Sequence, residues 1–155
     1  MTIVVTGAAG FIGSNFVLNW LTHSKEKVIA LDKLTYAGNL ENLKSVESNP
    51  NYSFVQGDIG DSTLIGKLLQ EHQPRAIINF AAESHVDRSI HGPDDFMETN
   101  ILGTYRLLEE ARSFFNTLSE EGQKKFRFLH VSTDEVYGTL SPTDPAFKET
   151  NQYEP

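Results

Sequence analysis

The chain has 155 residues, of which 39% are hydrophobic and 22% charged, with a formal net charge of −8. This composition is typical of one globular domain and excludes a disordered chain, while the negative charge argues against nucleic acid as the main partner. Without cysteine, a charged leader or an apolar stretch of membrane-spanning length, the chain is expected to be cytoplasmic, with no thiolate metal site and no membrane partner.

Five apolar runs predict β-strands, and helical stretches separate them. The runs are Ile3–Thr6, Lys27–Leu31, Tyr52–Gln56, Ala76–Phe80 and Arg127–Ser132. Nearly continuous apolar runs are typical of buried parallel strands. The alternation of strands and helices therefore predicts an α/β protein with a doubly wound, Rossmann-like parallel sheet and helices on both faces.

Three helices are predicted between these strands. The first covers Phe11–Thr22, the second covers Ser62–Glu71, and the third follows Pro93 and reaches Phe115. Beyond Gly138 the composition shifts to Ser, Pro, Thr and Asp, which predicts a surface loop without regular structure. The first helix carries an apolar stripe expected to face the core, made of Phe16, Val17, Trp20 and Leu21.

Three glycines, Gly7, Gly10 and Gly13, follow the first predicted strand. A strand that turns tightly into a helix presents free N–H groups of the helix to a pyrophosphate. Gly7 is expected to permit the turn, Gly10 to let the phosphates approach the backbone, and Gly13 to let the helix pack closely. The spacing differs from G-x-G-x-x-G, so an ordinary strand-to-helix turn is the alternative to a dinucleotide site.

Two carboxylates follow the second and third predicted strands. Asp32 lies 25 positions after Gly7, near the offset of about 20 residues at which an acidic residue binds the adenosine ribose. Its charge repels a 2′-phosphate and favours NAD over NADP, whereas the neighbouring Lys33 acts against that preference. Asp58 is expected at the same crevice, where it could accept a hydrogen bond from adenine. The alternatives are a solvated strand end for Asp32 and a turn or helix cap for Asp58.

Several motifs together resemble the extended short-chain dehydrogenases/reductases. They are the segments 6–13, Asp32, 57–59, 81–90 and 132–138. Within that family, the triplet Thr133-Asp134-Glu135 resembles dehydratases that act on nucleotide sugars, and the similarity covers essentially the whole chain. The family's C-terminal domain, which binds the nucleotide part of the substrate, has no counterpart in these residues. The resemblance therefore implies an NAD-binding domain over residues 1–155.

The resemblance implies a lyase reaction in three steps. Hydride passes from C4 of the sugar to NAD⁺, water leaves across C5 and C6, and the hydride returns to C6. Asp134 would be the acid that helps the C6 hydroxyl leave, and Glu135 the base that takes the C5 proton; Thr133 and Ser84 would bind the sugar. Adjacent carboxylates can take opposite roles only in different environments. On spacing alone, a solvated Asp-Glu turn is the alternative.

Contacts with the NAD cofactor are also implied by the resemblance. The implied residues are Gly7, Gly10, Phe11, Ile12, Gly13, Asp32, Lys33, Leu34, Thr35, Asp58, Ile59, Phe80, Ala81, Ala82, Glu83, Ser84 and Thr99. A threonine bonded to a preceding helix carbonyl is the alternative for Thr99. His85 is expected to be structural, because no nucleophile pairs with it. A homodimer through the helix after Pro93 is implied as well, with plain core packing as its alternative.

The family also uses a Tyr-x-x-x-Lys pair as its first base, and this chain has none. Four of its five tyrosines are followed, four positions on, by Leu40, Gln56, Glu109 and Ser141, and the fifth lies too near the end. The chain is therefore expected to be cut before that motif and to be inactive alone. A UDP-sugar 4-epimerase or decarboxylase, and a non-catalytic dinucleotide sensor, are the alternative functions.

Overall fold

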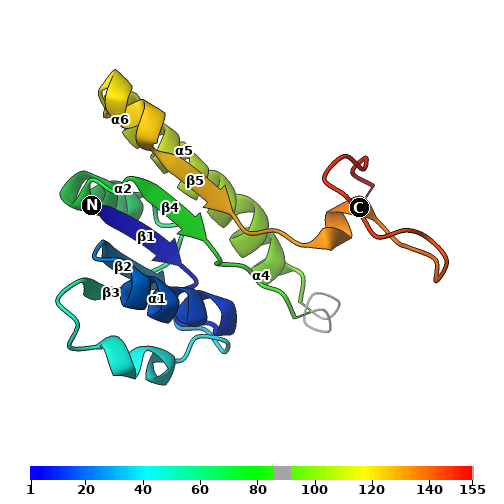
Figure 1. Cartoon of the computed structure of the whole chain (residues 1–155), viewed down its shortest axis with the longest axis horizontal. Coiled ribbons are helices and arrows are strands. Elements are labelled where there is room, and N and C mark those ends of the chain that lie inside the picture. Colours follow the sequence, from blue (N-terminus) through cyan, green and yellow to red (C-terminus); the bar gives the residue numbers. More distant parts are fainter. Residues whose placement is uncertain (86–91, 155) are drawn as a thin grey trace.

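A five-stranded parallel sheet forms the centre of the protein, in the order β3-β2-β1-β4-β5 (Figure 1). The computed structural model describes residues 1–85 and 92–154. The chain starts at the central strand, builds outward, and returns to the other side of β1, so the order reverses between β1 and β4. The predicted doubly wound α/β fold is confirmed. The strands are β1 (Thr2–Thr6), β2 (Lys27–Asp32), β3 (Tyr52–Gln56), β4 (Ala76–Asn79) and β5 (Arg127–His130).

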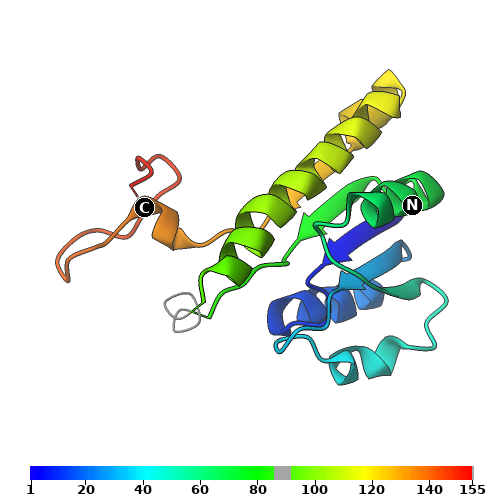
Figure 2. The same ribbon diagram turned by 180° about the vertical axis from the view of Figure 1, so that it is seen from behind.

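Side chains alternate between the two faces of the sheet and build a core on each. On one face, Val4 of β1 packs with α2 (Ser62–His72) and α5 (Thr104–Thr117). On the other, Ile3 of β1 packs beneath α1 (Phe11–His23). Figures 1 and 2 show these helices on opposite faces.

Strand β5 departs from the sequence prediction in two ways. It ends at His130 rather than Ser132, and its residues are not all buried. Phe128 packs against the core. Leu129 points to the other face and is 53% exposed, because β5 is an edge strand. The predicted burial of every strand is wrong for this one and for the other edge strand, β3, in which no residue is fully buried. Strand β4 also ends one residue early, at Asn79.

The predicted third helix is continuous in direction but changes type along its length. It consists of α4 (Asp94–Phe96), the π-helix η2 (Met97–Gly103) and α5. Only one stripe of α5 faces the core, through Leu107, Ala111 and Phe114. A second set of apolar residues is exposed: Met97, Ile101 and Leu102 in η2 and Tyr105 and Leu108 in α5. Plain core packing is therefore wrong for that second stripe.

Three short helices are absent from the sequence prediction because they carry little periodic signal. They are the 3₁₀ helices η1 (Leu40–Val46) and η3 (Asp134–Tyr137), and α6 (Glu120–Lys125). Among the residues of η1, only Leu43 is buried. Ser119 caps α6 by accepting a hydrogen bond from the Gly122 N–H. After Gly138 the described residues form no helix or strand and extend away from the sheet (Figure 1), as predicted.

The aromatic side chains of α1 pack as predicted. Phe16 and Trp20 stack with ring centroids 5.4 Å apart, and both lie against the core beside β1. Val17 between them is fully buried. By contrast, Phe11 and Ile12 at the start of α1 are 83% and 61% exposed. These two side chains therefore face solvent, whereas Gly13 and Ser14 beside them are buried.

Close packing of backbone shapes the turn from β1 into α1. Gly7 has a φ of +62°, and a Cβ on it would lie 2.7 Å from the amide nitrogen of Ala81. At Gly13, a Cβ would lie 2.1 Å from the carbonyl oxygen of Gly7. Glycine is required at both positions, the first because of its backbone conformation and the second because of the close approach.

An ion pair at the end of the sheet opposite this turn gives a prediction about pH. Arg75 donates from Nε and Nη2 to the Glu26 carboxylate, at 2.6 Å each, and its guanidinium lies over the ring of Trp20. The hydrogen bond from Arg75 lowers the pKa of Glu26 below its usual 4.5. Because folding lowers this pKa, the stabilisation is present above pH 4.5 and is lost as the pH falls through the folded-state value.

We therefore expect Arg75→Met to lower the free energy of unfolding at neutral pH by about 1 kcal/mol, since the pair is partly exposed. The variant should also lose less stability on acidification than the wild type, as measured by urea unfolding at several pH values. Lys125→Met, which breaks the exposed pair with Glu121, is the control and should change little. The prediction would be contradicted if wild type and Arg75→Met lost the same free energy of unfolding as the pH falls.

Candidate functional site

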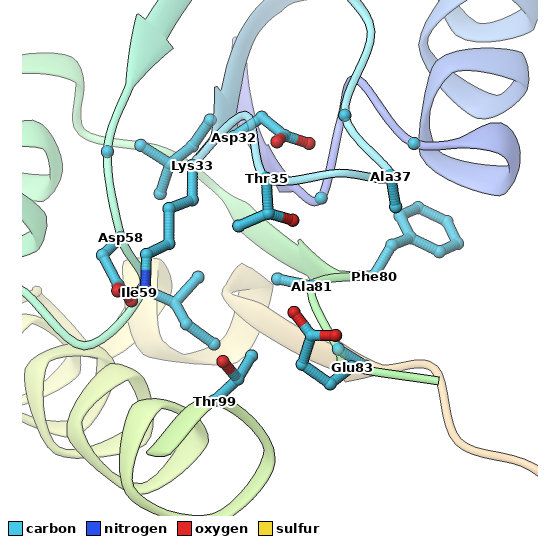
Figure 3. A pocket seen from close by; sticks show the side chains of 16 residues that line it. Asp32, Lys33, Thr35, Ala37, Asp58, Ile59, Phe80, Ala81, Glu83 and Thr99 are labelled. Carbon is cyan, nitrogen blue, oxygen red and sulfur yellow. Dashed lines mark ion pairs between the residues drawn. The ribbon is translucent and has the colours of Figure 1, made fainter. Parts of the chain in front are cut away.

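A cavity opens at the carboxyl ends of β1 to β4, where the strand order reverses (Figure 3). Ligands of doubly wound sheets bind at such a position. The lining comes from the loops after all four strands and from η2. It consists of Gly7, Gly10, Leu31, Asp32, Lys33, Thr35, Ala37, Gly38, Gly57, Asp58, Ile59, Phe80, Ala81, Ala82, Glu83 and Thr99.

The loop between β1 and α1 forms one wall of the cavity. Gly10 is the N-cap of α1, and the first intrahelical bond runs from the Ser14 N–H to its carbonyl. The preceding N–H groups of the first turn have no intrahelical partner, which is the arrangement that attracts a phosphate. A Cβ on Gly10 would lie 3.4 Å from the Gly7 oxygen, an ordinary contact. The protein's own packing therefore does not require glycine there, in contrast to Gly13.

Asp32 ties two walls of the cavity together. One carboxylate oxygen accepts from the Ala9 N–H and the other from the Leu34 N–H, each at 2.8 Å. The side chain is 8% exposed, so the alternative of a solvated strand end is wrong. Leu34 has a φ of +57°, and its N–H bond to Asp32 helps to hold this turn. The carboxylate thus fixes the loop between β1 and α1 against the loop after β2.

Asp58 accepts hydrogen bonds on both oxygens. Oδ1 takes the Gly60 N–H at 2.8 Å, and Oδ2 lies 2.7 Å from Nζ of Lys33. Burial acts to raise the pKa of Asp58, but the bonds from Lys33 and Gly60 and the charges of Lys33 and Arg106 outweigh it and lower the pKa. The hydrogen bond to Asp58 raises the pKa of Lys33 in turn. Asp58 is therefore a turn residue within the cavity wall, while Asp61 caps α2.

A buried polar network supports the loop after β4. The hydroxyl of Thr6 donates to Asn79, whose side chain is fully buried, and Asn79 bonds Nδ1 of His130 at 3.0 Å. The Ala81 N–H donates to the Thr6 hydroxyl at 3.3 Å. The network joins the ends of β1, β4 and β5 and fixes where Ala81 enters the cavity wall.

Further along this loop, Glu83 is held from two sides. Its N–H donates to Oδ1 of Asn100 and its carbonyl accepts from Nδ2 of the same residue, both at 2.8 Å. The Tyr36 hydroxyl donates to its carboxylate at 3.0 Å. Sequence reasoning missed Asn100 and Tyr36, because neither belongs to a local motif and both act across the fold. Their contacts position the segment around Glu83, which separates this cavity from a second one.

A second cavity adjoins the first and shares the segment 81–83 with it. Its lining includes Ser84 and the triplet Thr133, Asp134 and Glu135. The structure therefore brings the predicted sugar-binding and acid–base residues together, beside the predicted cofactor residues. All three residues of the triplet are exposed, and the Thr133 hydroxyl donates to Glu135 at 3.1 Å.

Five of the residues expected to contact the cofactor do not line the first cavity: Ser84 lines the second one instead, and the other four are Phe11, Ile12, Gly13 and Leu34. The first two offer backbone N–H groups rather than side chains, and the last two shape the loops. Thr99 does line the cavity. His85 lies beside Tyr36, with ring centroids 6.4 Å apart. Residues 86–90 of the resembling segment lie outside the described residues, and Leu31, Ala37 and Gly38 are lining residues that the motifs did not indicate.

Within residues 1–85 and 92–154, no three His, Asp or Glu side chains group as metal ligands would. None of the helices in those residues is long and apolar enough to cross a membrane.

Comparisons with known proteins agree on one group. A family model described as GDP-mannose 4,6 dehydratase matches residues 4–155. The dTDP-glucose 4,6-dehydratase of Xanthomonas campestris is 57% identical over 154 residues, covering 99% of this chain and 43% of that protein.

Solved structures give the same picture. DesIV, a dTDP-glucose 4,6-dehydratase of Streptomyces venezuelae crystallised with NAD, matches with a TM-score of 0.87 at 44% identity, over 100% of this chain and 46% of that one. A UDP-glucose 4-epimerase of Thermus thermophilus, also with NAD, matches at 0.81 and 29% identity, over 100% of this chain and 45% of that one. The chain thus spans under half the length of these proteins.

Proposed function

The chain belongs to the GDP-mannose 4,6 dehydratase family, within the extended short-chain dehydrogenases/reductases, and we propose that it is the NAD-binding part of a dTDP-glucose 4,6-dehydratase. The observation that carries the proposal is the adjacency of the two cavities, one lined by Asp32 and Asp58 and the other by the triplet Thr133-Asp134-Glu135. A hydride acceptor and an acid–base pair are what this dehydration needs side by side.

The first cavity offers polar groups suited to the parts of a dinucleotide. The free N–H groups at the start of α1 suit a pyrophosphate, and Gly10 leaves room for it. Asp32 retains lone pairs for ribose hydroxyls, and Asp58 stays ionised to accept from an adenine amino group. Bound NAD⁺ would supply the acceptor for hydride from C4 of the sugar. The chain's own residues bind and orient it.

The second cavity is where a hexose would lie. The Thr133 hydroxyl and Ser84 would bind the sugar, Asp134 would protonate the leaving C6 hydroxyl, and Glu135 would remove the C5 proton. Both carboxylates are exposed in the described residues, so residues beyond the described part would have to give them the different environments that opposite roles require. We propose that a C-terminal part supplies this cover, the nucleotide site and a Tyr-x-x-x-Lys pair.

Two other functions remain as outcomes of the test. A UDP-sugar 4-epimerase is supported by the fold match to the Thermus enzyme, but at 29% rather than 57% identity. A dinucleotide sensor is tested by the coding sequence after Pro155: continuation into a Tyr-x-x-x-Lys pair excludes a sensor. A cytoplasmic location is part of our proposal, because NAD⁺ and activated sugars are intracellular metabolites.

The direct test is calorimetric titration of NAD⁺ into the 155-residue chain, followed by an assay with NAD⁺ and dTDP-glucose. We expect binding of NAD⁺ and no 4-keto-6-deoxy product. Asp32→Ala should weaken NAD⁺ binding by at least about tenfold, because it removes the ribose acceptor and frees two loops. Equal affinities for variant and wild type would remove Asp32 from the site. Product formed by the chain alone would show that Tyr-x-x-x-Lys is dispensable.

We also propose that two copies of the chain pair through the exposed apolar stripe of η2 and α5. Met97, Ile101, Tyr105 and Leu108 follow one another at helical spacing, and all are exposed. A contiguous apolar stripe of this kind marks an interaction surface. Tyr105→Glu combined with Leu108→Glu should convert a dimer to a monomer in sedimentation experiments. Leu140→Glu, an equally exposed site in the tail, is the control. A monomeric wild type would contradict the proposal.

A further inference from the structure

Lys33 follows Asp32 directly, at a place where an NADP-binding site would carry a cation. In this type of fold, a basic side chain near the ribose carboxylate accommodates the 2′-phosphate of NADP. Lys33 has the required charge and position, but its Nζ lies 2.7 Å from Asp58 Oδ2. Figure 3 shows the side chain reaching from the end of β2 to the loop after β3. The Lys33 ammonium group is thus paired with Asp58, at the end of the cavity where adenine would lie.

A hydrogen bond orients the Asp58 carboxylate toward this cation. The Gly60 N–H fixes Oδ1, which leaves Oδ2 facing Lys33. Arg106 also acts on Asp58 by its charge, but its Nη1 donates to Glu98 at 2.8 Å. Lys33 is therefore the cation in direct contact with Asp58 among the described residues. The pair lies at the rim of the cavity, where the Lys33 side chain is 53% exposed and would be free to turn if Asp58 released it.

We propose that Asp58 is a specificity-determining residue for the cofactor, because it engages Lys33 and so withholds from the 2′-position the ammonium group that NADP⁺ needs. Asp32 acts in the same direction through its negative charge beside the ribose. The preference for NAD⁺ then has two parts, repulsion by one carboxylate and removal of the cation by another. This inference rests on the proposed use of NAD⁺.

Asp58→Asn is the variant that separates these parts. The amide keeps Oδ1 for the Gly60 N–H and places an NH₂ group, a donor, against the Lys33 ammonium. Lys33 is then released while the turn is kept. Because NAD⁺ and NADP⁺ share the adenine, any loss of adenine binding cancels in the ratio of their dissociation constants. We expect calorimetry to show this ratio, NADP⁺ over NAD⁺, falling by about tenfold, the effect of one charge-assisted hydrogen bond.

The control is the double variant Lys33→Met/Asp58→Asn, in which the pair is replaced without leaving a free cation. Its ratio should return to the wild-type value, because the local net charge matches that of the intact pair. An unchanged ratio in Asp58→Asn, with NAD⁺ still bound, would overturn this inference alone. An equal fall in the double variant would overturn it too, since Lys33 would then not be responsible. Wild type that binds neither cofactor would overturn the cofactor proposal itself.

Discussion

Replacing Glu135 with Gln is expected to lower the turnover of dTDP-glucose by about 10²–10⁴-fold, the usual contribution of a general base. The measurement needs a chimera of residues 1–155 and the remaining C-terminal part of the Xanthomonas relative, which is 57% identical over the shared part. The amide cannot take the C5 proton, so the reaction should stall after oxidation at C4. Reduced nicotinamide should then accumulate on the enzyme, as seen by its fluorescence.

The same chimera can separate the roles of the two carboxylates. In deuterium oxide, Asp134→Asn should still exchange the C5 proton although elimination is slow, whereas Glu135→Gln should not exchange it. Glu149→Gln removes the same charge from the exposed tail and should leave turnover unchanged. Exchange at C5 by Glu135→Gln would contradict the assignment of the base.

The second large effect is expected at Gly13. Alanine there would place Cβ 2.1 Å from the Gly7 carbonyl oxygen and 2.9 Å from its carbon, both backbone atoms that cannot move aside cheaply. We expect a loss of about 3 kcal/mol or more in the free energy of unfolding, measured in urea, because overpacking forces the backbone to shift. Against the roughly 5–15 kcal/mol of a whole domain, such a loss is severe.

Gly10→Ala is the matched control, because its Cβ would meet the Gly7 oxygen at an ordinary 3.4 Å. We expect its stability to change by less than about 1 kcal/mol, while its affinity for NAD⁺ falls, since the methyl group occupies the approach to the phosphates. Gly13→Ala with wild-type stability would show that the turn can relax. Gly10→Ala with wild-type affinity would remove Gly10 from the phosphate site.

The parts of the fold that repeat a strong local pattern could be predicted from the sequence. Buried strands such as β2 and the apolar stripe of α2 carry that pattern, and the structure confirms them. Helix η1 carries no such pattern. Its one buried residue is Leu43, and a single buried side chain cannot produce a helical periodicity in the sequence. The exposure of Leu129 could not be predicted either, because the sequence of a strand does not show whether another element covers that strand.

The candidate site divides in the same way. The positions of Gly7 and Asp32 follow from spacing after a strand, and both line the cavity. By contrast, the hydrogen bond between Glu83 and Asn100 joins residues that are 17 positions apart. The ion pair of Lys33 with Asp58 joins the ends of two different strands. Such contacts depend on how loops meet in space. Motif reasoning could name these residues without showing which of them would hold one another.

The central place of β1 has a consequence for how the protein folds. Ile3 pairs with Val28 on one side and with Ala76 on the other. During synthesis, the first strand must therefore wait until the fourth has left the ribosome before its second edge is paired. Non-local parallel pairing of this kind slows folding and exposes strand edges meanwhile. The turn at Gly7 packs against Ala81, so this contact can form only when more than half of these residues have been made.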